Sequence, residues 1–161
     1  MLPWLGRTMK GIDLFMADFF KTNAIDLTKV QIIMLRMLSQ NDGQPQNNLA
    51  YVTDRDKTSL TRLITTMEKK GLVKRIASKE DRRVNNIFIT PKGKQELSTA
   101  IPVIKNAIDV IESGLTDDER RQTLNLLEKI RKNINAEELT ALLNNWHLWE
   151  ITLQLLLEFC C

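Results

Sequence analysis

Residues 57–93 of this chain read KTSLTRLITTMEKKGLVKRIASKEDRRVNNIFITPKG, and the pattern of this stretch decides the fold. Its first third places Leu60, Leu63, Ile64 and Met67 at i, i+3, i+4 and i+7. That spacing is typical of one buried face of an amphipathic helix. The stretch therefore predicts a helix that packs on an apolar core.

The residues around this helix predict its two ends and a hairpin after it. Asp56 can cap its first turn by accepting hydrogen bonds from backbone N–H groups, and Gly71 can end it as a C-terminal cap. The β-prone stretches 72–76 and 86–90 follow, joined by a long basic connection. Two such stretches indicate a β-hairpin with a charged tip.

Helical signals continue on both sides of this stretch. The predicted helices cover about 8–21, Thr28 to about Asn41, 48–52, a segment from Pro91 that is kinked or interrupted at Pro102, and a last segment with a capping box at Thr116 and Glu119. The caps rest on side-chain oxygens that accept from the first turn, and Pro91 suits a first helical position because its missing N–H costs nothing there. The order of helix, turn, helix, hairpin and helix is the winged helix-turn-helix arrangement.

The composition fits one compact domain. The chain has 161 residues, of which 43% are hydrophobic, 27% charged and only 6% aromatic. Cys160 and Cys161 are adjacent, so they cannot form the disulfide framework of a small secreted domain. The sequence shows neither a secretory leader nor a long uncharged apolar run, so we expect a cytoplasmic protein that does not enter a membrane.

Positive charge is concentrated around the predicted helix and hairpin. Between Arg55 and Lys94 there are twelve lysines and arginines but four acids, although the whole chain has a net charge of only +3. Opposite its apolar stripe, the helix carries hydrogen-bond donors and no carboxylate, at Thr58, Arg62, Thr65 and Lys69. Donors of this kind suit a helix that lies in the major groove of DNA.

From about Leu27 to Ile134 the chain resembles the MarR family of bacterial regulators. The matching elements are Leu27-Thr28 with Gln31, Leu35 and Leu38; Leu49-Ala50; Lys69-Lys70-Gly71-Leu72-Val73; Asp81, Arg83, Ile89-Thr90 and Gly93 in the hairpin; and Leu115-Thr116-Asp117-Asp118-Glu119-Arg120. The hairpin pattern is the most specific of these. The turn Thr53-Asp54-Arg55 departs from the family, which generally has apolar and glycine residues there.

The resemblance implies a mainly α fold with a small β-hairpin wing. Residues 1–26 would form an N-terminal dimerisation helix, residues 27–94 the winged helix-turn-helix DNA-binding lobe, and residues 95–135 the C-terminal dimerisation helices. Residues 136–161 lie outside the family pattern. Their apolar residues repeat at three- and four-residue steps, which predicts a helical tail that packs on the dimer or on a partner.

The same resemblance assigns the DNA contacts. The major-groove candidates are Lys57, Thr58, Ser59, Thr61, Arg62 and Thr65. Lys69 is assigned to the DNA backbone and Lys79 to phosphates. In the wing, Asp81 is expected to pair with Arg83 and hold the tip, and either Arg82 or Arg83 is expected to enter the minor groove.

The expected function is sequence-specific binding of duplex DNA by a homodimeric repressor at a pseudo-palindromic operator. A small aromatic effector is a further expected partner. It would lie near Phe15, Phe19 or Met34, although such residues are more often plain core. We expect no cofactor, no metal and no enzymatic activity, because one histidine, two terminal cysteines and no phosphate-binding glycine loop assemble no catalytic site. Two alternatives stay open: a winged-helix module that acts through protein contacts, and a ligand sensor that binds no DNA.

Overall fold

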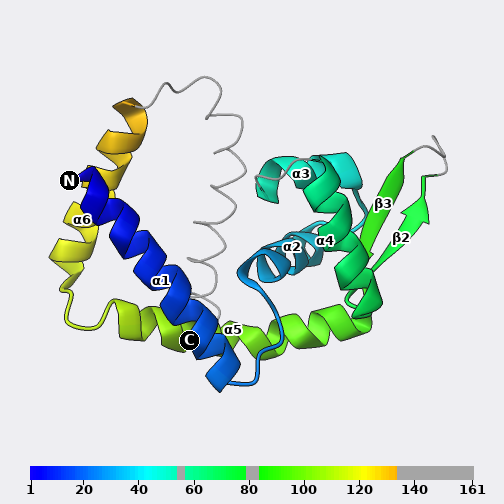
Figure 1. The fold of residues 1–161 in the computed structure, drawn as a ribbon, viewed down its shortest axis with the longest axis horizontal. Coiled ribbons are helices and arrows are strands. Elements are labelled where there is room, and N and C mark those ends of the chain that lie inside the picture. Colours follow the sequence, from blue (N-terminus) through cyan, green and yellow to red (C-terminus); the bar gives the residue numbers. More distant parts are fainter. Residues whose placement is uncertain (54–56, 79–83, 134–161) are drawn as a thin grey trace. The chain divides into compact units, whose positions relative to one another are not determined.

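The computed structural model describes residues 1–53, 57–78 and 84–133, and the side chains of all of these except 50–53 and 57. It divides into two compact units, Met1–Ala107 and Ile108–Cys161. The elements, all but β1 labelled in Figure 1, are α1 (Leu2–Thr22), α2 (Lys29–Gln40), β1 (Gln44–Pro45), α3 (Gln46–Thr53), α4 (Lys57–Lys69), β2 (Val73–Ala77), β3 (Asn85–Ile89), α5 (Pro91–Ile111) and α6 (Asp117–Asn133).

The predicted cap at Thr28 and the predicted capping box at Thr116 are confirmed, and the Thr28 cap is itself a capping box with Gln31. The Thr28 hydroxyl accepts from the backbone N–H of Gln31 at 3.3 Å, and the Gln31 side chain accepts from the N–H of Thr28 at 3.0 Å, which starts α2. At the start of α6, Thr116 and Glu119 make the same reciprocal pair. Each box satisfies backbone donors that a helix start would otherwise leave without partners.

One predicted helix limit is wrong. The first helix begins at Leu2 rather than near residue 8, with proline in its first turn, where the missing N–H does no harm. Of the two alternatives predicted at Pro102, a kink or an interruption, the interruption is excluded, because α5 runs from Pro91 to Ile111 with this proline inside it.

The sheet has three antiparallel strands in the order β1-β3-β2, of which Figure 1 shows β2 and β3 beside α4. In β2 and β3, Val73 pairs with Ile89 and Ala77 with Asn85, so the predicted hairpin is confirmed with strands displaced by one residue. Strand β1 was not predicted from the sequence. A carboxylate oxygen of Asp42 accepts from the N–H of Gly43 at 3.0 Å and from that of Ile89 at 2.9 Å, which ties the loop before β1 to the end of β3.

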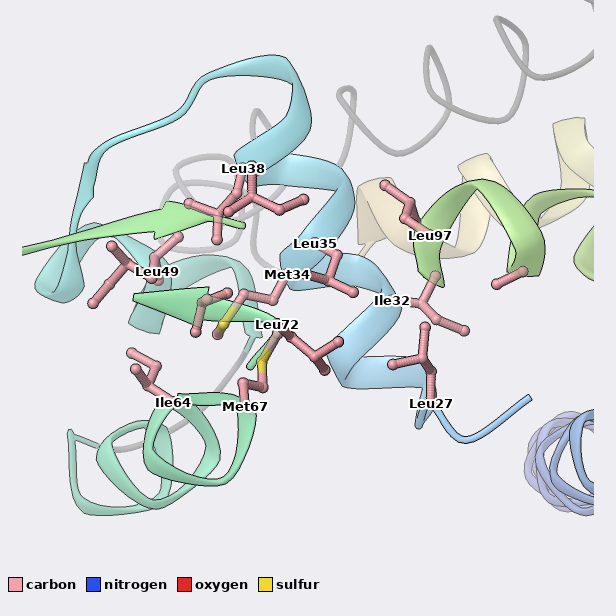
Figure 2. Packing of buried hydrophobic residues seen from close by; sticks show 14 of the residues in the cluster. Leu27, Ile32, Met34, Leu35, Leu38, Leu49, Ile64, Met67, Leu72 and Leu97 are labelled. Atoms are coloured by element: carbon pink, nitrogen blue, oxygen red, sulfur yellow. The ribbon is translucent and has the colours of Figure 1, made fainter. Parts of the chain in front are cut away.

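The core of the first unit lies between α2, α4 and the sheet. Figure 2 shows Met34 and Leu35 of α2 meeting Leu72, with Ile64 and Met67 of α4 beside them. All five side chains are buried, with at most 2% of their surface exposed. The aliphatic residues predicted as the buried stripe of α4 therefore do face the core.

The second unit is described through residue 133 and contains the end of α5 and all of α6. None of the α6 side chains is buried, and Leu124, Leu126 and Leu127 are exposed. Ion pairs within the helix join Arg121 to Asp118 and Lys132 to Glu128. Among the residues with described placement, no helix is both long and apolar enough to cross a membrane.

Candidate nucleic-acid interface

Helix α4 presents three different faces. Leu60, Ile64 and Met67 are buried in the core, and Leu63 is half-buried beside them. Thr58, Arg62 and Lys69 lie opposite and are exposed. The face predicted to be free of carboxylates is confirmed, because the single acid of the helix, Glu68, lies about a quarter-turn away from it.

That acid belongs to a flank of α4 that faces β2. Thr61, Thr65 and Glu68 follow one another along this flank, and Arg75 of β2 lies across all three. Arg75 Nη1 pairs with Glu68 Oε2 at 3.0 Å, and its Nη2 donates to Thr65 Oγ1 at 3.0 Å and to the Thr61 carbonyl at 3.2 Å. The backbone N–H of Arg75 donates to the other oxygen of Glu68 at 3.1 Å. A single guanidinium thus connects the helix to the wing.

A second contact orients α4 against the preceding helix. The side-chain amide of Gln46, at the start of α3, donates to the Thr61 hydroxyl at 3.0 Å. Residues 54–56, between α3 and α4 in the sequence, lie outside the described residues, and the predicted cap at Asp56 is one of them. Gln46 nevertheless joins the two helices of the helix-turn-helix on the side where the sheet begins.

The C-terminus of α4 ends in a Schellman motif, as Gly71 predicted. Gly71 has φ +72°, its N–H donates to the Glu68 carbonyl at 2.8 Å, and the N–H of Leu72 donates to the Met67 carbonyl at 2.9 Å. The positive φ favours glycine because a side chain there would crowd the backbone. This turn directs the chain straight into β2.

The start of α5 is fastened to the same turn. The Thr90 hydroxyl lies 2.6 Å from the Gly71 carbonyl oxygen and accepts from the N–H of Gly93 at 3.0 Å, which confirms Thr90 as the predicted cap. Lys92 Nζ donates to the Lys70 carbonyl at 2.9 Å. The end of α4, the base of the wing and the start of α5 therefore form one bonded junction.

The positive charges of this region divide into two groups. Arg75 pairs with Glu68, and Lys70 pairs with Asp26 at 2.9 Å, so both are used inside the lobe. Arg62 and Lys69 are exposed on α4. The guanidinium of Arg62 makes no hydrogen bond or ion pair with any residue of described placement. Arg62 and Lys69 are therefore available to an external anion, whereas Lys70 and Arg75 of the predicted basic cluster are already paired.

The predicted site residues do not all lie on one surface. Thr58, Arg62 and Lys69 share the exposed face, and Ser59 is half-buried on the other flank. Thr61 and Thr65 lie toward β2, with their hydroxyls engaged inside the lobe. Lys57 begins α4 without a described side chain, and the wing-tip residues Lys79, Asp81, Arg82 and Arg83 lie outside the described residues. The effector candidates divide as well, because Met34 is fully buried in the core whereas Phe15 and Phe19 are half-buried on α1.

Gln46, Glu68 and Arg75 were missed as site residues. The sequence did offer one signal, because Glu68 is the lone acid of α4 and such an acid needs a cation partner. The sequence does not reveal that this partner is Arg75, because the distance between the two residues depends on strand register. The described residues contain no group of three or more histidine, cysteine, aspartate or glutamate side chains placed to hold a metal ion.

The fold and the exposed donor helix define a winged helix-turn-helix protein. A model of the MarR family matches residues 27–84. The homoprotocatechuate degradative operon repressor of Escherichia coli is 32% identical over 104 residues, which cover 65% of this chain and 70% of that protein. The HTH-type transcriptional regulator YybA of Bacillus subtilis is 27% identical over 137 residues, or 85% of this chain and 90% of that protein. The chain belongs to the MarR family.

The fold is also found among solved structures. The transcriptional repressor CouR, in a structure bound to a 23-mer DNA duplex, superposes with a TM-score of 0.71 at 24% identity, covering 78% of this chain and 88% of that one. At this identity the likeness concerns the fold. It includes the winged lobe and agrees with the order of helices and strands described above.

Proposed function

We propose that this protein is a repressor that binds duplex DNA sequence-specifically, with α4 in the major groove. The observation that carries the proposal is the exposed face of α4, where Arg62 and Lys69 project beside Thr58 while the only acid of the helix is turned to Arg75. Guanidinium and hydroxyl groups match the acceptors of phosphates and base edges. The DNA duplex bound by CouR supports the same use of the fold.

The proposal includes a homodimer acting in the cytoplasm. Large apolar side chains of α1 are exposed, with 71% of the surface of Trp4 and 64% of that of Leu14 accessible, and α6 exposes three leucines. Apolar surface of this extent indicates a protein interface. A two-fold dimer would place two copies of α4 on half-sites about one helical turn of DNA apart, which is the reason to expect a pseudo-palindromic operator.

A small aromatic compound is the proposed effector that releases the repressor. The support is the name of the Escherichia coli relative, which refers to the degradation of homoprotocatechuate, a phenolic acid. On α1 of this chain, the half-buried rings of Phe15 and Phe19 lie with centroids 5.4 Å apart and their planes tilted by 36°. Aromatic rings of this kind suit an aromatic ligand, although a role in packing explains them too.

The decisive experiment selects bound duplexes from a random pool and then measures affinity for the selected duplex and for a scrambled one at several salt concentrations. We expect a pseudo-palindrome, a dimer by sedimentation, and affinity for both duplexes that falls steeply with salt. Salt-independent binding would contradict phosphate contacts. Failure to select any sequence, together with capture of a specific protein, would favour the alternative of a module that acts through protein contacts.

A further inference from the structure

Thr65 occupies a distinctive place on α4, at the border between the flank that faces β2 and the exposed face. It lies three residues after Arg62 and four residues before Lys69, so it is adjacent to both exposed cations on the helix surface. Its side chain is half-buried. A group that lies along the exposed face would therefore pass directly beside the Thr65 hydroxyl.

The hydrogen bonds of this hydroxyl have only one possible direction. Thr65 Oγ1 lies 2.8 Å from the carbonyl oxygen of Thr61, which can only accept, so the hydroxyl proton points to that carbonyl. Arg75 Nη2, 3.0 Å away, can only donate, so it occupies one of the two lone pairs of Oγ1. One lone pair remains. To an outside group, Thr65 offers an acceptor and no donor.

Arg75 is itself fixed in place. The two oxygens of Glu68 accept from Nη1 and from the backbone N–H of Arg75, at 3.0 Å and 3.1 Å. The planar guanidinium can reach Glu68 and Thr65 at once because its donors form a rigid fork. A lysine ammonium is a single point of charge without that fork. The Glu68–Arg75 ion pair thus holds in place the guanidinium that donates to the Thr65 hydroxyl.

We propose that Arg75 and Glu68 are positioning residues that present Thr65 to DNA as a hydrogen-bond acceptor, so that Thr65 selects a base with an amino group. In the major groove those amino groups are N6 of adenine and N4 of cytosine, whereas guanine and thymine offer acceptors there. This inference rests on the proposed function, since it names what one residue of the DNA-reading helix recognises.

The first test compares Thr65 with Thr65→Val, which has the same shape but no acceptor, on the selected duplex. Each adenine is replaced in turn by purine, and each cytosine by pyrimidin-2-one, which removes the amino group. At one position in each half-site, the replacement should weaken binding by the unmodified protein about fivefold, as expected for one lost hydrogen bond. The variant should lose that extra sensitivity. The analogues also weaken base pairing, but this effect is the same for both proteins. It cancels when the loss of affinity of the unmodified protein is divided by that of Thr65→Val.

The second test applies the same base analogues to Arg75→Met and Glu68→Gln. Both variants should lose most of the sensitivity at that position, while affinity for a scrambled duplex and the salt dependence stay near those of the unmodified protein. Arg75→Lys should not restore the sensitivity. Lys74→Met is the matched control, because it removes the same charge from the neighbouring exposed position of β2. If Arg75→Met fails to fold, Thr65→Val and Glu68→Gln decide.

The outcomes separate the two proposals. Suppose that the unmodified protein prefers the selected duplex, and that each base analogue weakens binding by Thr65→Val and by the unmodified protein to the same extent. The acceptor role of Thr65 is then wrong and the proposed function stands. If Thr65→Val loses the sensitivity while Arg75→Met and Glu68→Gln keep it, the positioning role is wrong. If the unmodified protein prefers no duplex, the proposed function fails and this inference fails with it.

Discussion

Gly93, in the first turn of α5, lies so close to Leu72 that a Cβ built on it would be 2.2 Å from the Leu72 carbonyl oxygen. The approach results from Thr90, whose backbone N–H donates to that same carbonyl at 3.0 Å. Since the atom in the way belongs to the backbone, no side-chain rotation can relieve the contact. The glycine is therefore a condition for fastening α5 to the base of the wing.

Gly93→Ala should lower the free energy of unfolding by about 1–3 kcal/mol, the usual cost of forcing extra volume into a packed site. Urea denaturation would measure it. Gly11→Ala is the matched control, because nothing lies within 4 Å of a Cβ at that helical position. The control should be neutral or more stable by about 0.5–1 kcal/mol, since alanine favours helix. Equal effects of the two substitutions would contradict the close approach.

Asp42 should stabilise the sheet through its acceptor oxygen and not through its negative charge. Asp42→Ala removes the acceptor for the N–H of Ile89, a residue that is 5% exposed, and should cost about 1–3 kcal/mol. Asp42→Asn keeps an acceptor oxygen and should recover most of that loss. Thermal unfolding of the two variants tests the assignment, which fails if asparagine is as damaging as alanine.

Glu119 should titrate below the ordinary glutamate range. The backbone N–H of Thr116 and, second, its hydroxyl donate to the carboxylate and lower the pKa of Glu119. Because the pKa is lower in the folded state, the contribution to stability is present above the ordinary value of about 4.3 and is lost as the pH falls through the folded value. Carbon-detected NMR of the Glu119 carboxyl would report the midpoint.

Thr116→Ala gives the control for this titration. It removes the hydroxyl but keeps the backbone N–H, which is the larger cause, so the midpoint should rise only part of the way toward the ordinary value. A full return would mean that the hydroxyl alone holds the carboxylate.

Arg62→Ala should weaken binding to the selected duplex by about tenfold or more and relax the preference at one base pair, as expected for loss of a direct contact. Fluorescence anisotropy on single-base variants of the duplex measures both effects. Arg7→Ala is the control, because it removes the same charge from an exposed position on α1. If Arg7→Ala and Arg62→Ala weaken binding equally at every sequence, then Arg62 contributes only net charge.

Local patterns predicted most of the winged lobe. The buried stripe of α4, the Gly71 cap and the N-cap at Thr28 depend on residues within one or two turns of each other, so spacing alone reveals them. The strand β1 could not be found this way. It has two residues, one of them proline, and it exists only because Gln44 pairs with Ile87, a residue far along the chain.

The same limit applies to the candidate interface. The exposed face of α4 follows from helical periodicity, which identified Arg62 and Lys69. To predict the contacts of the flank that faces β2, one must know which β2 residue lies over Thr65. That depends on the twist and register of the hairpin. The early start of α1 was missed for another reason: the side chain of Trp4 is exposed, so the first turn adds nothing to a buried stripe.

The carbonyl of Leu72 has a consequence for local opening of the lobe. It accepts from the N–H of Thr90 at 3.0 Å and lies 3.1 Å from the Thr90 hydroxyl, while the N–H of Leu72 closes the end of α4. The amides of Leu72 and Thr90 should therefore exchange with deuterium through one shared event, at matching rates. The end of the helix, the root of the hairpin and the next helix would then melt and re-form together as a single cooperative segment.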